Sequence, residues 1–215
     1  MRSVLVTGGT VRLGKAIADR LRAEGWRVIT SSHRADAGAD IVADLAEPMG
    51  AAKLYAAALQ MLGGLPPDAL VNNAALFTGD AAAIAAVNLD APKKLTMLMA
   101  GRETSVGAVV NVLDAKALDG VRQQSTAADS YRNSKRELAA FTRSAAAPFA
   151  ATLRVNGVAP GPVMAPTNVH EKAGEMLLDR RPTADDVAAA VSYLLGAEST
   201  TGAIIPVDAG QHLIR

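Results

Sequence analysis

The stretch Val4–Gly14, with the sequence VLVTGGTVRLG, decides the fold of this chain. Its β-branched start predicts a strand over 3–7, and the amphipathic pattern that follows predicts a helix over 13–24. Glycines between two such elements permit a tight turn and let the backbone approach a diphosphate at the free amides of the helix N-terminus. Arg12 stands where such a turn usually has its middle glycine. The stretch therefore predicts a dinucleotide-binding turn, with an ordinary strand-to-helix connection as the alternative.

Short β-branched runs alternate with longer Ala- and Leu-rich stretches along the whole chain, which is typical of βαβ units. We therefore expect an α/β fold of the Rossmann type, doubly wound, with a mainly parallel seven-stranded sheet and helices on both faces. The expected strands span 3–7, 27–31, 39–43, 68–72, 106–113, 152–156 and 203–207. The expected helices span 13–24, 48–62, 80–100, 125–147 and 184–196. Thr183 and Asp186 form a capping-box pattern at the start of the last helix.

The composition of the chain excludes several classes of protein. The 215 residues contain no linker, repeat or composition break, so we expect one domain over 1–215. The 22 basic and 21 acidic side chains leave a net charge of +1, which disfavours a nucleic-acid partner. The absence of cysteine excludes disulfides and thiolate ligands, and three histidines leave little for a metal centre. Because the sequence has neither a signal-peptide pattern nor an apolar run of membrane-spanning length, we expect a cytoplasmic protein.

The end of the second expected strand predicts which nicotinamide cofactor is bound. In dinucleotide-binding folds a carboxylate there binds the adenosine ribose of NAD, whereas basic side chains accept the 2′-phosphate of NADP. The strand ends in Ser31-Ser32-His33-Arg34, and the nearest acid, Asp36, lies beyond this end. His33 and Arg34 therefore favour NADP over NAD. The alternative interpretation is a solvated turn in which Arg34 binds no ligand.

Two further segments follow expected strands at the same edge of the sheet. Asp44 and Leu45 come after the third strand, where Asp44 is placed to accept a hydrogen bond from an adenine amino group. An exposed loop aspartate is the alternative interpretation. The fourth strand ends in Asn72-Asn73-Ala74-Ala75, and this pair of amides with small neighbours suits a strand end that lies close to a cofactor.

Tyr131 and Lys135, within the sequence YRNSK, form the pair with the clearest chemistry. Residues at i and i+4 share one face of a helix, so the ammonium of Lys135 lies close to the phenol of Tyr131. A nearby positive charge lowers the pKa of a phenol from about 10 and makes it a usable proton donor near neutrality. A surface pair of Tyr and Lys without such a role is the alternative interpretation.

These motifs together resemble the short-chain dehydrogenase/reductase family over nearly the whole chain. They occur in the family order: TGGTVRLG at 7–14, Asp44, NNAA at 72–75, Asn88, YRNSK at 131–135, NGVAPG at 156–161, Thr201-Gly202 and VDAG at 207–210. The resemblance implies NADPH/NADP binding by Gly8, Thr10, Arg12, Leu13, Gly14, His33, Arg34, Asp44, Leu45, Asn73, Ala74, Ala75, Tyr131, Lys135, Pro160 and Gly161. It also implies that Lys135 binds the nicotinamide ribose, that Asn88 organises a proton-relay water, and that the protein is a homo-oligomer, commonly a tetramer, with the 125–147 helix in an interface.

Asp114 departs from the family pattern, which has a serine at the end of the fifth strand to hydrogen-bond a substrate carbonyl. An ionised carboxylate would repel the alkoxide that develops when a ketone is reduced. Reduction of a C=N bond instead needs a proton at nitrogen, which a carboxyl group supplies itself or through a water that it holds. Asp114 therefore favours a nitrogen-containing acceptor, and a capping or salt-bridged acid is the alternative interpretation.

Within the family, this replacement resembles the pteridine reductases, including the branch that reduces dihydrofolate and dihydromonapterin. That branch has an arginine where this chain has Arg12, a His-Arg pair as at 33–34, and a phenylalanine, here Phe77, that stacks the pterin ring against nicotinamide. The resemblance implies substrate binding by Arg12, Phe77, Asp114 and Tyr131, and catalysis by Asp114, Tyr131, Lys135 and Asn88. Phe77 as a core residue under a loop and Arg12 as a solvated helix-start residue are the alternatives.

We therefore expect an NADPH-dependent reductase of a dihydropterin-like C=N bond that uses no metal. An NADPH-dependent carbonyl reductase, with Asp114 protonated or turned away, is the rival enzyme, and a non-catalytic NADP-binding regulatory protein is the rival of another class. Ala75 and Ala209 replace glycines of the family pattern. The segment near 162–181 corresponds to the family's substrate loop and is short.

Overall fold

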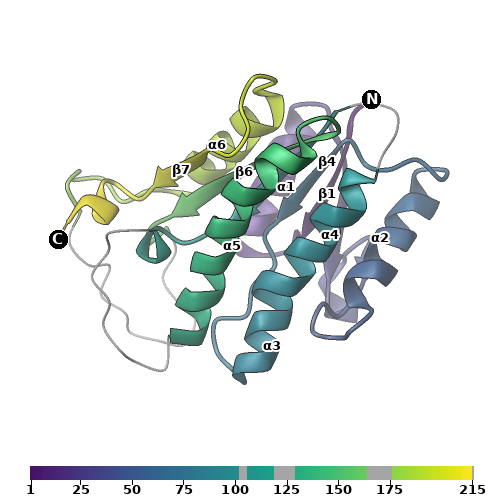
Figure 1. Cartoon of the computed structure of the whole chain (residues 1–215), viewed down its shortest axis with the longest axis horizontal. Helices are drawn as coiled ribbons and strands as arrows, with labels where there is room; N and C mark the ends of the chain where they lie inside the picture. Colours follow the sequence, from purple (N-terminus) through teal and green to yellow (C-terminus); the bar gives the residue numbers. More distant parts are fainter. Residues whose placement is uncertain (102–105, 119–128, 164–175, 215) are drawn as a thin grey trace.

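Seven strands form one sheet in which every neighbouring pair is parallel, in the order β3-β2-β1-β4-β5-β6-β7 (Figure 1). This computed structural model describes residues 1–101, 106–118, 129–163 and 176–214. The strands are β1 Ser3–Thr7, β2 Arg27–Ser32, β3 Ile41–Val42, β4 Ala69–Asn72, β5 Gly107–Val112, β6 Leu153–Pro160 and β7 Ile204–Val207. The expected Rossmann-type doubly wound architecture is confirmed, and the sheet is parallel throughout.

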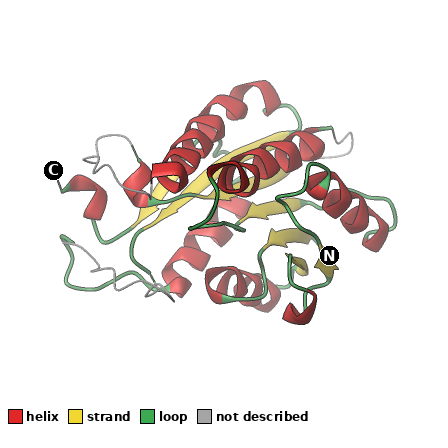
Figure 2. Cartoon of the chain, turned by 90° about the horizontal axis from the view of Figure 1, so that it is seen from below, coloured by secondary structure: helices red, strands yellow, loops and turns green. Residues whose placement is uncertain are grey.

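Helices cover both faces of this sheet, as Figure 2 shows. They are α1 Arg12–Ala23, α2 Gly50–Met61, α3 Ala81–Ala85, α4 Ala91–Ala100, α5 Asp129–Phe149 and α6 Ala184–Gly196. Side chains alternate along β1, so that Val4 and Val6 pack against α1 and α6 while Leu5 packs against α2 and α4. Because both faces of the strand are buried, its central residues Val4–Val6 are all apolar. Within the described residues, no helix is long and apolar enough to span a bilayer.

The strand order reverses beside β1, which pairs with β2 on one side and with β4 on the other. At such a switch point the loops leaving the two central strands diverge, and a crevice opens at their carboxyl ends. The carboxyl ends of β1 and β4 are Thr7 and Asn72. The turns that carry the glycine motif and the NNAA motif therefore begin at the same place.

Two strands differ by three residues in length from their expected ranges. The strand expected over 39–43 is only Ile41–Val42, and the strand expected over 152–156 runs from Leu153 to Pro160. The extended β6 pairs with β5 from Leu153 to Val158 and with β7 from Gly157 to Pro160. The composition NGVAPG favours a turn, but two flanking strands override that preference because each supplies a ladder of hydrogen bonds. Packing explains the glycine at position 157, since a Cβ there would lie 2.8 Å from the Leu113 side chain.

The helix expected over 80–100 is present but contains a π-turn over Ala86–Asp90, between α3 and α4. Proline has no backbone N–H, so Pro92 cannot donate to the carbonyl of Asn88 four residues earlier. The wider turn accommodates this missing bond and places Asn88, which is fully buried, at its centre. Sequence periodicity indicated the helix but not this widened turn.

The remaining helices lie close to their expected ranges. The capping box at the start of α6 is confirmed, because Thr183 Oγ1 accepts from the Asp186 amide and Asp186 accepts from the Thr183 amide. In α5 the described helix begins at Asp129 and ends at Phe149, two residues beyond the expected end. Residues 125–128 of the expected range lie outside the described residues, as does most of the 162–181 segment.

Candidate active site

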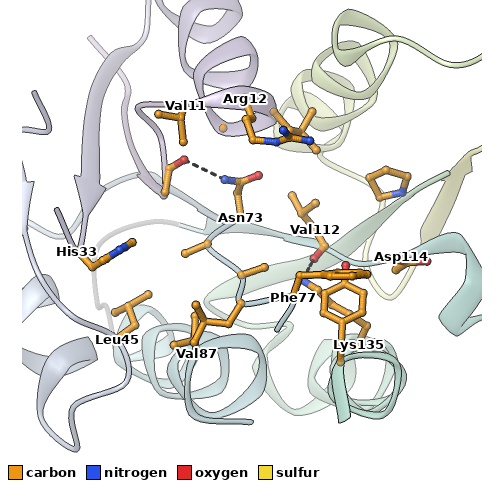
Figure 3. A pocket seen from close by; sticks show the side chains of 18 of the residues that line it. Val11, Arg12, His33, Leu45, Asn73, Phe77, Val87, Val112, Asp114 and Lys135 are labelled. Atoms are coloured by element: carbon orange, nitrogen blue, oxygen red, sulfur yellow. Dashed lines mark hydrogen bonds between the residues drawn. The ribbon is translucent and has the colours of Figure 1, made fainter. Parts of the chain in front are cut away.

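A cavity of about 1120 Å³ lies at the carboxyl ends of the strands, and Figure 3 shows it from close by. Its volume lies above the range of about 300–1,000 Å³ that is usual for small-molecule sites, which leaves room for a dinucleotide together with a substrate. Every residue expected to bind cofactor or substrate lines this cavity, from Gly8 in the first turn to Gly161 after β6. Among the residues expected to act in catalysis, Asn88 does not line the cavity and lies behind its wall. His33 and Leu45 lie at one end, and Phe77, Asp114 and Lys135 lie at the other.

Asn73 joins the turn after β1 to the end of β4. Its side-chain amide donates to the carbonyls of Thr7 and Gly8, at 3.0 and 3.1 Å. The Thr7 hydroxyl in turn accepts from the backbone amides of Asn73 and Ala74. Gly14 closes the turn, since a Cβ there would lie 2.0 Å from the Gly8 carbonyl oxygen. The glycine and asparagine motifs are therefore two halves of one rigid structure.

Arg12 has a φ of 49°, in the left-handed region that favours glycine. This explains why related turns have a glycine at the position, and it means that the arginine is retained here against a backbone cost. Arg12 is the first residue of α1, and in Figure 3 its side chain extends over the cavity toward the end that holds Phe77. The Arg12 guanidinium therefore lies between the two ends of the cavity.

The walls near α1 fit a diphosphate. The N-terminus of α1 has no side-chain cap and no acidic residue in its first turn, so its amides face the cavity without a competing carboxylate. The Thr10 hydroxyl is buried and has no hydrogen-bond partner among the described residues. A buried hydroxyl without a partner is costly, and an anion bound at the helix N-terminus would satisfy it.

The other end of the cavity contains the residues expected to contact adenosine. Arg34 is exposed and forms a two-bond ion pair with Asp36, at 3.0 Å from Nε and 2.7 Å from Nη2. This pairing raises the pKa of Arg34 and lowers the pKa of Asp36. The Asp44 carboxylate accepts from the Ala46 amide within its own loop, at 2.8 Å. Leu45 is buried below this loop.

Asp114, Tyr131 and Lys135 meet at the far end of the cavity. The Asp114 carboxylate follows β5, accepts from the Lys116 amide at 2.8 Å, and accepts a hydrogen bond from Tyr131 on α5. Lys135 Nζ donates to the Val112 carbonyl at 2.8 Å and lies 5.9 Å from the centre of the Tyr131 ring. The packing of β5 against α5 therefore brings Asp114 close to Tyr131, which is 17 residues further along the sequence.

Burial changes the acid-base properties of this group. It lowers the pKa of Lys135 from 10.5 to about 8, and the Asp114 charge partly opposes this change. Burial likewise raises the pKa of Asp114, against the lowering effects of the Lys116 amide, of Lys135 and of Tyr131. Burial disfavours both the Lys135 ammonium and the Asp114 carboxylate, because little water reaches either group. An acid whose pKa is raised in this way retains its proton closer to neutrality and is a better proton source there.

Phe77 lies in the loop between β4 and α3, and its ring centre is 4.8 Å from that of Tyr131 at an angle of 55° between the planes. The Phe77 side chain is 46% exposed. This exposure is inconsistent with a core residue, and the cavity lies beside the ring. A flat substrate next to Tyr131 would therefore contact Phe77.

Asn88 lies behind this wall and connects its parts. Its amide oxygen accepts from the Leu76 amide at 2.7 Å, and its Nδ2 donates to the Leu76 carbonyl and to Ser134 Oγ. Ser134 donates to the Tyr131 carbonyl. The Asn88 side chain thus fixes the loop that carries Phe77 relative to the helix that carries Tyr131.

Sequence reasoning missed several residues that line the cavity: Val87, Lys116, Arg132, Arg181 and Gln211. Val87 adjoins Asn88 and Arg132 lies within the motif YRNSK, so the motifs were a usable signal for these two residues. Gln211 comes from the turn after β7, and no pattern in the sequence indicated it. Among the described residues, no cluster of His, Cys, Asp and Glu side chains is suited to a metal ion.

Comparisons with known proteins agree with this geometry. A family model described as short chain dehydrogenase matches residues 2–176. Protein FixR from Bradyrhizobium diazoefficiens is 30% identical, over 98% of this chain and 86% of its own length. Pteridine reductase 1 from Leishmania tarentolae is 29% identical, over 98% of this chain and 96% of its own.

Solved structures include one with a similar fold over the full chain. This is FolM alternative dihydrofolate reductase 1 from Brucella canis in complex with NADP. It superimposes with a TM-score of 0.85 and 32% sequence identity, and the match covers 100% of this chain and 95% of that protein.

Proposed function

The chain belongs to the short-chain dehydrogenase family, and on this premise we propose that it is an NADPH-dependent oxidoreductase that reduces a C=N bond of a dihydropterin-like ring. The observation that carries the proposal is the contact between Tyr131 and the Asp114 carboxyl. This contact supports the proposal because Asp114 occupies the sequence position at which the family pattern has a serine. The similarity to Leishmania pteridine reductase 1 and to Brucella FolM supports the same substrate class.

The residues of this chain fit NADPH as the cofactor. The amides at the start of α1 and the Thr10 hydroxyl suit its diphosphate. Ser32, His33 and Arg34 line the end of the cavity where a 2′-phosphate would lie. Lys135 is assigned to the nicotinamide ribose. When bound, NADPH supplies a hydride to the ring carbon of the C=N bond.

The remaining requirement is one proton at the ring nitrogen, so that the C=N bond becomes CH–NH. Tyr131 is the proposed proton donor, and Asp114 assists by its own proton or through a water that it holds. Lys135 stabilises the phenolate that the Tyr131 donation leaves. Phe77 holds the ring against the nicotinamide side of the cavity. Arg12 contacts the cofactor phosphate and the substrate.

A C=N acceptor fits this group better than a carbonyl. Reduction of a ketone develops negative charge on oxygen beside Asp114, which repels it whenever the carboxyl is ionised. Reduction of a C=N bond instead requires a proton at the nitrogen, which would lie beside Asp114. The same carboxyl that hinders the first reaction therefore assists the second.

Family membership also suggests a homo-oligomer, commonly a tetramer, with α5 in an interface. Light scattering on the purified protein tests this part separately. A monomer would remove the oligomer from the proposal and leave the chemistry unaffected.

The function is tested by steady-state assays with NADPH and three kinds of acceptor: dihydrobiopterin, dihydromonapterin and simple ketones. We expect turnover of the pterins. Efficient turnover of ketones, with no turnover or binding of pterins, would favour the carbonyl reductase. Tyr131→Phe separates catalysis from binding, because turnover should collapse by about 10²- to 10⁴-fold while NADPH affinity survives. A chain without turnover whose NADPH affinity is normal would be a regulatory binding protein.

A further inference from the structure

Asp36 lines the cavity and lies three residues after His33, which Figure 3 shows at the end opposite Phe77. The cofactor placement described above gives this acid no role. Its Oδ1 accepts from Arg34 Nε at 3.0 Å, and its Oδ2 accepts from Arg34 Nη2 at 2.7 Å. Two parallel bonds of this kind use the edge of a guanidinium that also suits a phosphate. Asp36 therefore occupies donors of Arg34 that the 2′-phosphate of NADPH is expected to use.

The loop between β2 and β3 keeps this carboxylate in position. The Arg34 amide donates to Ser32 Oγ at 3.1 Å, and the Ala37 amide donates to the Arg34 carbonyl at 3.3 Å. At the base of the loop, Asp40 Oδ2 accepts from the backbone amide and from the hydroxyl of Thr30, at 2.8 and 2.7 Å. Because the acid and the guanidinium belong to one short loop that is closed at its base, the carboxylate has a high effective concentration at Arg34.

The charge of Asp36 opposes the binding of a phosphate at this place. The hydrogen bonds from Arg34 lower the pKa of Asp36, so the carboxylate is ionised near neutrality. A phosphate monoester carries about two negative charges there. It either displaces the carboxylate, which costs the ion pair, or binds beside it, which brings like charges together. Both side chains are exposed, at 61% and 71%, so water and salt keep the effect moderate.

We propose that Asp36 is an internal competitor for the 2′-phosphate of NADPH and thereby sets how strongly this chain prefers NADP over NAD. This proposal rests on the proposed placement of the 2′-phosphate at Arg34, and it adds a residue that weakens binding there. NAD has no phosphate at this position, so its binding does not require the ion pair to open. Asp36 therefore lowers the affinity for NADPH and leaves the affinity for NADH nearly unaltered.

The test measures binding without turnover, with adenosine 2′,5′-bisphosphate and 5′-AMP as probes of the adenosine end of the cofactor. Asp36→Asn removes the charge and keeps the size of the side chain. In titration calorimetry we expect this variant to bind the bisphosphate about two- to fivefold more tightly, as the usual strength of exposed ion pairs implies. Binding of 5′-AMP should stay nearly unchanged. The gain should shrink as the ionic strength rises, because salt screens exposed charges.

A double-mutant cycle separates competition at Arg34 from a general change of charge. Arg34→Gln by itself should weaken binding of the bisphosphate, and Asp36→Asn in that background should add much less than it does alone. Asp19→Asn is the matched control. Asp19 is an exposed acid that pairs with Arg22 on α1, and it is outside the set of described residues that line the cavity. Its substitution changes the net charge equally and should affect neither probe.

Three results would overturn the proposal: no gain in Asp36→Asn, an equal gain for 5′-AMP, or an undiminished gain in the Arg34→Gln background. If Arg34→Gln leaves bisphosphate binding unchanged, the 2′-phosphate lies elsewhere and its placement fails together with the proposal. If Arg34→Gln weakens binding but Asp36→Asn brings no gain, the placement stands and only the competition is rejected. Pterin reduction enters none of these measurements, and the unfolding midpoint of each variant in urea shows whether the fold is retained.

Discussion

The rings of Phe77 and Tyr131 are 4.8 Å apart, although they come from a loop after β4 and from a helix after β5. This contact places an exposed flat surface beside the proposed proton donor. Phe77→Ala should raise KM for a dihydropterin by about ten- to a hundredfold, because stacking of a base on an aromatic ring contributes about 1–3 kcal/mol. Phe77→Tyr, which retains the ring, should keep KM near the unmodified value. An unchanged KM in Phe77→Ala would remove stacking from the proposal.

Asp114→Asn should lower kcat for a dihydropterin by about 10²-fold or more, because an amide cannot supply the proton. The amide oxygen can still accept from the Lys116 amide, so the 3₁₀ turn is retained. NADPH affinity should therefore not change. Stopped-flow measurement of a single turnover reads the chemical step directly. Asp114→Ser restores the residue of the family pattern and should gain activity with ketones. A fully active Asp114→Asn enzyme would contradict the role given to the carboxyl.

Arg34→Asp should weaken NADPH binding by about tenfold or more relative to NADH. In the free protein Arg34 is paired with Asp36, so the substitution leaves two carboxylates near the expected 2′-phosphate. Fluorescence titration with the two cofactors measures the difference. Lys53→Asp also reverses a charge, on α2 and away from the cavity, and should change neither affinity. An equal effect of Arg34→Asp on both cofactors would place the 2′-phosphate elsewhere.

Lys135 makes the stability of the cofactor-free protein depend on pH. Its folded pKa of about 8 lies below the ordinary 10.5, so between these values the unfolded chain holds a proton that the native state has released. Raising the pH through this window therefore increases the free energy of unfolding, on the order of 3 kcal/mol in full. Lys135→Met should abolish this increase in urea titrations from about pH 7 to about pH 10. Lys53→Met, at a side chain that is 68% exposed, should keep the original dependence.

Ala209 has a φ of 55°, where the family pattern has glycine. A residue with a Cβ in the left-handed conformation costs about 1–2 kcal/mol of stability. Replacing it with glycine removes this cost, but the greater conformational entropy of glycine in the unfolded chain offsets part of the gain. Ala209→Gly should thus stabilise the protein by about 0.5–1 kcal/mol, which thermal unfolding detects. Ala190→Gly, in the middle of α6, should instead destabilise it by about 1 kcal/mol. A destabilised Ala209→Gly would mean that the methyl group has a packing role.

Much of the fold could be predicted because its signals are local. The alternation of β-branched and Ala-rich stretches indicated each strand and helix, and the capping box of Thr183 and Asp186 marked the start of α6. The residues that the sequence predicted to bind cofactor and substrate also line one cavity. In a parallel sheet every strand delivers its following loop to the same edge, so motifs that follow strands converge.

Some features depended on neighbours that are distant in sequence. The length of β6 follows from pairing on both sides, and the π-turn at Asn88 follows from Pro92 together with the buried contacts to Leu76 and Ser134. Local patterns do not specify such contacts, because several partners are equally accessible along the chain.

The sequence by itself determined the order of elements, the glycine turn at 7–14 and the identity of the Asp114, Tyr131 and Lys135 group. Periodicity and backbone conformation encode these features within a few residues. Only the tertiary structure decided that burial shifts the pKa of Lys135 and that Phe77 contacts Tyr131. The pKa shift arises because β5 packs against α5 and excludes water, and the ring contact arises because the loop after β4 reaches α5.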